Sequence, residues 1–162
     1  RSRIQTGRVF IRGDSGSTHI PPPSGSTVTF REGGVDLKHN PGFLKIVEAA
    51  KQRVRECSIS DVKARLDRAE AFHFVDVRED SEFEQDHAAG AIHLGKGVIE
   101  RDIETIIPNK REPIVLYCGG GYRSALAADS LGQMGYTNVL SMDGGIKAWR
   151  DAGFPMDKGS RP

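Results

Sequence analysis

The chain has 162 residues, 37% of them hydrophobic and 28% charged, which is ordinary for one globular domain with extra sequence at an end. The formal net charge is +1 and the basic residues form no clustered patch, so we expect no nucleic-acid partner. No apolar run approaches the roughly 20 residues of a membrane-spanning helix, so we expect no membrane partner.

The two cysteines, Cys57 and Cys118, bear on the cellular compartment. They can form at most one disulfide, and the N-terminus lacks the apolar segment of a secretory signal. Two thiols in such a chain are typical of a reducing environment, so we expect a cytoplasmic protein.

Residues 1–39 differ in composition from the rest of the chain. Short β-like pieces at 8–12 and 27–30 flank a stretch rich in glycine, serine and proline, and its three consecutive prolines cannot join a helix or a central strand. We interpret residues 1–39 as an N-terminal arm, either without regular structure or folded as a small hairpin on the domain edge.

An N-terminal extension helix is predicted over residues 40–56. Asn40 can cap this helix, and Pro41 suits its first position. Its apolar residues recur at helical spacing, namely Phe43, Leu44, Val47, Ala50 and Val54. This apolar stripe indicates packing against the main domain or against a second copy of the chain.

Strand and helix patterns alternate over residues 57–157, which we interpret as one domain followed by a tail at 158–162. Strands are predicted at 57–59, 72–77, 91–94, 114–117 and 139–141. Helices are predicted at 61–69 with Ser60 as cap, 81–86, 98–107, 124–134 and 146–152. In the third of these helices, five residues are expected to face inward: Val98, Ile99, Ile103, Ile106 and Ile107. The alternation predicts an α/β fold of three layers, a central and mainly parallel sheet covered by helices on both faces.

The segment IVLYCGGGYRS at 114–124 has the pattern of a catalytic loop. Cys118 follows a buried strand, where reactive groups of parallel sheets are found, and three glycines then permit unusual backbone conformations. Such a turn can direct several N–H groups at one anion, while the next helix and Arg123 add positive charge. These features favour the thiolate of Cys118, which is the nucleophilic form. The candidate residues are Cys118 as the catalytic residue and Gly119, Gly120, Gly121, Tyr122, Arg123 and Ser124 as the loop that binds substrate.

Four motifs in matching order resemble the rhodanese homology family over about residues 58–156. The segment 118–124 resembles the family's active loop, a cysteine followed by a glycine-bearing run and often by Arg-Ser. The other motifs are DVRE at 76–79; EF at 82–83 with His87 and GAIH at 90–93; and DGG at 143–145 with AW at 148–149 and GFP at 153–155. Ala88-Ala89 stands where the family often has Ile-Pro, a change confined to a connecting turn.

This resemblance implies a three-layer rhodanese-like fold and a single-domain sulfurtransferase. Sulfane sulfur would move from a small anionic donor such as thiosulfate to a thiol or cyanide acceptor, through a persulfide on Cys118. The covalent persulfide carries the sulfur, so neither a metal nor an organic cofactor is expected. In the family, Asp76 and Arg78 lie near the loop as supporting residues. Arg78 would order the loop or attract the donor, unless it forms a structural ion pair with Glu82 or a nearby acid.

Two other functions stay open. Related cell-cycle phosphatases use a loop one residue longer, usually with histidine before the cysteine, whereas Tyr117 precedes Cys118 here and six residues run from Cys118 to Arg123. That length favours a sulfane sulfur over a phosphoryl group, which makes a cysteine phosphatase or arsenate reductase the less favoured enzyme. The other hypothesis is a non-catalytic sulfur-relay or interaction module that receives sulfur from a relay protein.

The remaining residues that could carry chemistry have simpler interpretations. His87 is interpreted as a structural hydrogen-bonding residue, Trp149 as core, and His73 as facing a helix or solvent. Cys57 is interpreted as structural, the alternative being a resolving thiol for the catalytic cysteine. Tyr122 either walls the pocket or points outward at the loop tip. No cysteines and histidines have the spacing of a zinc site.

Overall fold

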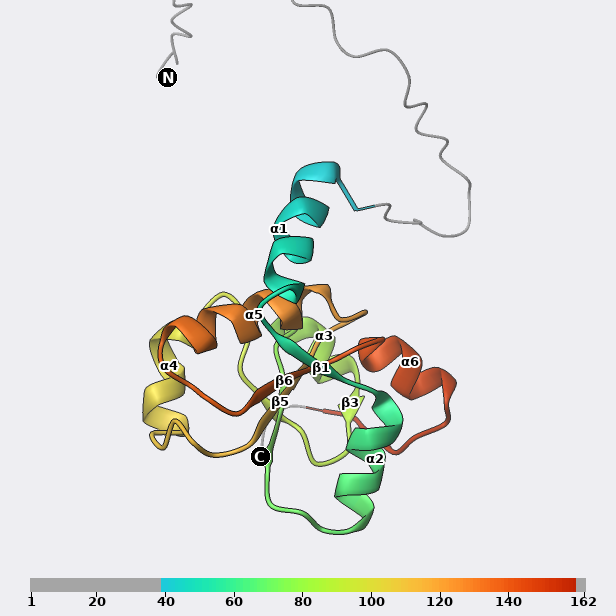
Figure 1. The fold of residues 1–162 in the computed structure, drawn as a ribbon. Helices are drawn as coiled ribbons and strands as arrows, with labels where there is room; N and C mark the ends of the chain where they lie inside the picture. Colours follow the sequence, from blue (N-terminus) through green and yellow to red (C-terminus); the bar gives the residue numbers. More distant parts are fainter. Residues whose placement is uncertain (1–38, 160–162) are drawn as a thin grey trace, which may run out of the picture. The chain divides into compact units, whose positions relative to one another are not determined.

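In the computed structural model, residues 39–159 are described, and most of their strands join one sheet. The predicted arm lies outside the described residues except for its last residue, and so do the last three residues of the predicted tail. The sheet order is β1 (Arg55–Cys57), β6 (Val139–Met142), β5 (Ile114–Tyr117), β2 (His73–Asp76) and β4 (Ile92–His93), and all neighbours are parallel. The predicted parallel sheet is therefore confirmed (Figure 1).

Helices cover both faces of this sheet (Figure 1). Residues of α4 (Ile99–Ile106) and α5 (Tyr122–Gln133) share one core cluster, and residues of α2 (Ile59–Asp67) and α6 (Gly145–Asp151) share the other. The short α3 (Asp80–Gln85) follows the carboxyl end of β2. Beyond it, β3 (His87–Ala88) pairs antiparallel with β7 (Met156–Asp157) in a separate two-stranded ribbon.

The central strand β5 shows why the apolar run at 114–117 becomes a buried strand. All four of its residues are buried. Ile114 and Leu116 enter one core cluster, whereas Val115 and Tyr117 enter the other, because successive side chains of a strand point to opposite faces. A strand covered on both faces needs apolar residues at every position.

Several helices begin or face differently from the predictions, each for a local reason. Helix α2 begins after Ser58 rather than Ser60, because Ser58 and Asp61 form a reciprocal capping box. Helix α5 begins at Tyr122 rather than at residue 124, since the preceding glycine serves as its N-cap. Val98, the N-cap of α4, and Ile106 within α4 are 37% and 46% exposed, so the prediction that all five apolar residues face inward was wrong. Apolar residues spread over 98–107 span more than one helix face.

The extension helix is present as α1 (Pro41–Lys51), shorter than the predicted 40–56 because β1 already begins at Arg55. Asn40 is its N-cap, although the Asn40 side chain makes no capping hydrogen bond. Val47 and Ala50 are buried, and the helix packs on α5. Packing of this helix against the domain is thus confirmed.

Removing the cap of α2 should destabilise the domain measurably. Ser58→Ala is expected to lower the free energy of unfolding by about 1 kcal/mol, because it removes the hydroxyl that accepts the Asp61 N–H. Ser60→Ala is the matched control, since Ser60 is exposed, and it should change that free energy by less than about 0.5 kcal/mol. Urea titration followed by circular dichroism measures both. Equal losses in the two variants would contradict the assignment of the cap.

Candidate active site

Cys118 lies where the chain leaves the carboxyl end of β5 and turns into α5. The residue is buried, with 1% of its surface exposed. The Gly121 N–H donates a hydrogen bond to Cys118 Sγ at 3.1 Å. Gly121 has a φ of 102°, in the left-handed region that glycine adopts without strain. The glycine run therefore lets the backbone turn back and place an N–H group on the sulfur.

A buried hydroxyl group lies beside the same sulfur, and a second buried hydroxyl group is hydrogen-bonded to the first. Ser124 Oγ lies 3.6 Å from Cys118 Sγ and 2.9 Å from Ser141 Oγ. Both serines are fully buried. Because a hydroxyl both donates and accepts, Ser124 can donate to a Cys118 thiolate and accept from a thiol. The sequence analysis identified Ser124 but missed Ser141, which lies on β6 and stands in no motif.

Two backbone N–H groups at the start of α6 form hydrogen bonds to the loop. The Ile146 and Lys147 N–H groups donate to the carbonyl oxygens of Cys118 and Gly119 at 2.8 and 3.1 Å. Gly145 permits this approach, because a Cβ there would lie 2.6 Å from the Gly119 carbonyl oxygen. The sequence analysis quoted the glycine pair at 144–145 only as part of a motif and did not identify its contact with the loop.

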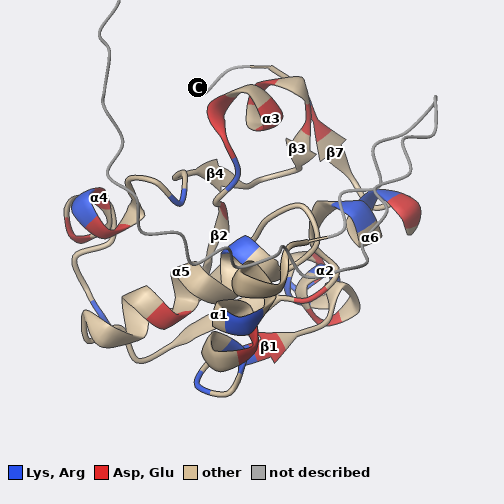
Figure 2. Cartoon of the chain, turned by 90° about the horizontal axis from the view of Figure 1, so that it is seen from above, with Lys and Arg blue, Asp and Glu red and all other residues tan. Residues whose placement is uncertain are grey.

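Arg123 does not point freely at the sulfur. Its Nη1 and Nη2 atoms donate to Glu82 Oε2 and Oε1 at 2.7 and 3.0 Å, which forms a bidentate ion pair with α3. The hydrogen bond from Arg123 holds the pKa of Glu82 below its ordinary value, although partial burial opposes this. Carboxylates gather along α3 and the turn before it (Figure 2). The sequence analysis did not predict this partner of the loop arginine.

Asp76 and Arg78 form a buried ion pair beside the strand ends. Arg78 Nη2 donates to Asp76 Oδ2 at 2.7 Å and to the Asp86 carbonyl oxygen at 2.6 Å. Asp76 is fully buried and Arg78 is 4% exposed. The Arg78 partner is thus a nearby acid, as the structural alternative held, but it is Asp76 rather than Glu82. A buried and paired guanidinium is not placed to attract a donor from solvent.

Tyr117, directly before the cysteine, is part of the same buried framework. Its hydroxyl oxygen accepts the Ala88 N–H at 3.0 Å. Burial, together with the nearby Asp76 carboxylate, raises the pKa of Tyr117. The phenol therefore stays neutral and serves to tie β5 to β3.

Tyr122 faces the extension helix. Its ring meets His39 and Phe43 edge to face, with ring centroids 4.7 and 6.2 Å apart, and Lys51 Nζ lies 5.5 Å from its centroid. Tyr122, the first residue of α5, is therefore packed against α1, a contact that no motif predicted.

Two residues that the sequence analysis interpreted as structural, His87 and Trp149, make the contacts expected of them. His87 Nδ1 lies 2.9 Å from the Phe83 carbonyl oxygen, and its ring stacks on Phe83. Trp149 is fully buried, and its indole N–H donates to the Pro155 carbonyl oxygen. Burial, with a smaller effect of nearby acids, raises the pKa of Cys57 to about 11, so this thiol stays protonated at neutral pH. Its role as a resolving thiol stays an untested alternative.

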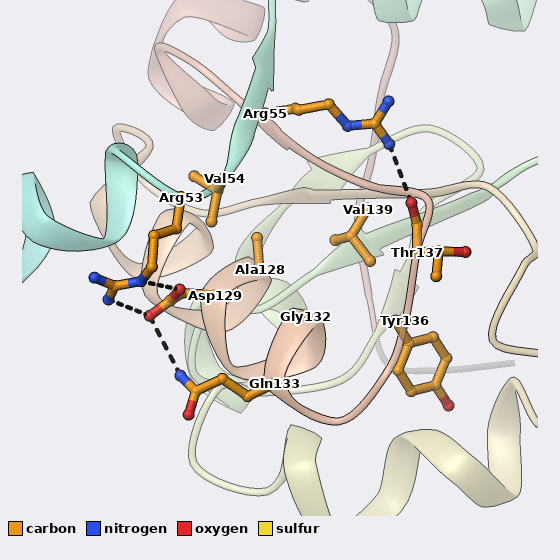
Figure 3. A pocket seen from close by; sticks show the side chains of 10 residues that line it. All are labelled: Arg53, Val54, Arg55, Ala128, Asp129, Gly132, Gln133, Tyr136, Thr137 and Val139. Atoms are coloured by element: carbon orange, nitrogen blue, oxygen red, sulfur yellow. Dashed lines mark hydrogen bonds and ion pairs between the residues drawn. The ribbon is translucent and has the colours of Figure 1, made fainter.

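A cavity of about 670 Å³ lies away from the loop, at the amino end of β6 and the far end of α5 (Figure 3). Arg53 and Asp129 close one side through a bidentate ion pair at 2.8 and 2.7 Å. None of its lining residues belongs to the candidate loop at 118–124. Within residues 39–159, no group of three or more potential ligand side chains could hold a metal ion, and no helix is long and apolar enough to cross a membrane.

Known proteins that are similar to this chain carry names that describe different chemistry. Thiosulfate sulfurtransferase PspE of Escherichia coli is 36% identical over 89 residues, which cover 55% of this chain and 82% of PspE. Bacillus subtilis YrkF, provisionally named a sulfur carrier protein, is 29% identical over 96 residues, 59% of this chain and 51% of YrkF.

A solved structure is similar over a longer stretch. It is a Rhodopseudomonas palustris protein of unknown function, named as a possible tyrosine phosphatase. It superimposes with a TM-score of 0.67 at 29% identity and covers 76% of this chain and 100% of its own. The Rhodanese-like domain family matches residues 58–152, which include the whole loop and every strand of the main sheet except β1. The chain therefore belongs to the rhodanese-like domain family.

Proposed function

We propose that this protein is a rhodanese-type sulfurtransferase that carries sulfane sulfur as a persulfide on Cys118. The observation that supports this most is the loop itself, with a cysteine at a strand end, an N–H group on its sulfur and a hydroxyl beside it. These groups stabilise negative charge on sulfur without a metal or an organic cofactor. The name of PspE is consistent with this proposal.

The proposed reaction has two half-reactions and is redox neutral. First, the Cys118 thiolate attacks the outer sulfur of a donor such as thiosulfate. The donor's S–S bond breaks, sulfite leaves with the bonding electron pair, and a persulfide remains on Cys118. Second, cyanide or a thiol attacks the terminal sulfur of the persulfide, and the Cys118 thiolate is restored.

A sulfur-relay role uses the same persulfide with a protein as donor or acceptor. The name of YrkF is consistent with such a role, although this chain spans only about half the length of YrkF. The loading step on Cys118 is the same in both cases, so relay and free-standing catalysis differ only in which molecules supply and remove the sulfur.

A phosphatase is the less favoured alternative, despite the name of the R. palustris protein. The segment from Cys118 to Arg123 has six residues, and its arginine is bound bidentately to Glu82. A phosphate ester needs a cation that can bind its oxygens, and that cation is already paired here.

Intact-mass measurement after incubation with thiosulfate tests the proposal. The chain is expected to gain the mass of one sulfur atom, and cyanide should remove it. Hydrolysis of p-nitrophenyl phosphate, measured on the same preparation, should be slower than the thiosulfate:cyanide reaction. A chain that never gains sulfur but hydrolyses the ester would refute the sulfurtransferase assignment.

A further inference from the structure

The positive charge of Arg123 is balanced by Glu82, whose carboxylate is held in place by hydrogen bonds. Glu82 is held on two sides, because one of its carboxylate oxygens accepts the Glu79 N–H at 3.0 Å while both oxygens accept from Arg123. The pair is only partly exposed, with 31% of the Arg123 side chain and 36% of the Glu82 side chain accessible. Since the pKa of Glu82 lies below its ordinary value, the pair persists at neutral pH.

Two other cations beside the loop, Lys51 and Lys147, are also paired with carboxylates. Lys51, beside Tyr122, lies 2.8 Å from Glu56 and 3.7 Å from Asp143. Lys147, whose N–H binds the loop, lies 3.1 Å from Asp151. Glu79 also acts on Arg123 through its charge. Around these three cations stand five carboxylates, those of Glu56, Glu79, Glu82, Asp143 and Asp151, so this set of groups supplies no surplus positive charge.

This charge balance discriminates between sulfur donors. Thiosulfate is a dianion, so its attack by a thiolate brings three negative charges into one pocket. A persulfide R–S–SH carries at most one negative charge, which leaves at most two with the thiolate. Because like charges at short range repel strongly in a partly buried site, the dianion requires a cation that this loop does not supply.

We infer that the site takes its sulfur from the persulfide of a thiol in preference to thiosulfate, and that Glu82 sets this preference by occupying Arg123. The inference rests on the proposed function and narrows its donor class. The Cys118 thiolate forms a bond to the outer sulfur of R–S–SH, and the donor's S–S bond breaks. The electron pair of that bond leaves on R–S⁻, while the outer sulfur keeps its proton as it joins Cys118. The Cys118 persulfide, a stronger acid than a thiol, then passes this proton to R–S⁻, which leaves as R–SH. A persulfide anion remains on Cys118, so atoms, charge and oxidation state balance.

Cysteine persulfide and thiosulfate, compared at equal concentrations, test the inference through the rate of sulfur loading on Cys118. The wild-type chain should load faster from cysteine persulfide. Glu82→Gln keeps the shape of residue 82 but removes its negative charge, so the charge of Arg123 becomes available to the donor. The ratio of the thiosulfate loading rate to the persulfide loading rate should then rise about tenfold, which is the effect expected of one charge in a half-exposed site. Asp129→Asn is the matched control, because it breaks the bidentate Arg53–Asp129 pair at the far end of α5 and should leave the ratio unchanged.

Salt dependence gives a readout that needs no variant. Added salt screens repulsion, so it should raise the wild-type thiosulfate rate more than the persulfide rate. Equal wild-type rates from both donors, or an unchanged ratio in a folded Glu82→Gln variant, would overturn the inference while leaving the sulfurtransferase intact. Failure of both donors to load Cys118 would instead refute the proposed function.

Discussion

Cys118→Ser is expected to abolish sulfur transfer. A serine hydroxyl can take the hydrogen bonds from Gly121 and Ser124, so the fold should persist, but oxygen cannot hold sulfane sulfur as a persulfide. The thiosulfate:cyanide rate should fall by at least roughly three orders of magnitude, as when an enzyme loses its nucleophile. No mass gain of one sulfur atom should follow incubation with a donor.

Cys57→Ser is the matched control for this substitution. The Cys57 thiol is half-buried and lies 3.9 Å from the Ser141 carbonyl oxygen. Its pKa of about 11 keeps it protonated at neutral pH, so it should not take part in transfer. Turnover in Cys57→Ser should therefore stay close to that of the wild type. Substantial turnover in Cys118→Ser, or loss of turnover in Cys57→Ser, would show that the nucleophile has been assigned to the wrong residue.

Gly145→Ala is expected to damage both stability and turnover, although Gly145 makes no contact with substrate in the proposed mechanism. Its φ of 56° lies in the left-handed region, which costs an alanine about 1–2 kcal/mol. The new Cβ would also meet the Gly119 carbonyl group, with 2.6 Å to its oxygen and 2.7 Å to its carbon. Backbone must then move, which adds about 1–3 kcal/mol and displaces the loop that holds Cys118.

Gly153→Ala separates the cost of a left-handed φ from the cost of the steric clash with the loop. Gly153 has a φ of 69°, but a Cβ there would meet nothing within 4 Å. It should lose only the conformational contribution of about 1–2 kcal/mol and keep its turnover. Ala69, with a φ of 51°, shows that this chain accommodates an alanine in that region. Urea unfolding and the sulfur-transfer rate measure both variants. Equal effects would mean that contact between Gly145 and the loop is unimportant.

Much of the fold was predictable because the signals are local. A buried strand such as 114–117 is continuously apolar, and a helix such as α1 repeats its apolar residues every three or four positions. The cap of α2 was misplaced by two residues, because Ser58 and Ser60 are both acceptable caps and only Asp61 favours the first. The direction of Val98 and Ile106 was also mispredicted, since a run of apolar residues does not reveal which of them the sheet will cover.

The sequence by itself determined the candidate loop at 118–124, because its cysteine, glycines and helix start are neighbours in the chain and their conformations are local. Only the tertiary structure decided what surrounds that loop. Glu82 pairs with an arginine 41 positions away, Gly145 supports the loop from another helix, and Tyr122 packs against α1. These contacts depend on how separate elements pack, and a side chain such as Arg123 can find its carboxylate partner on any element brought within reach.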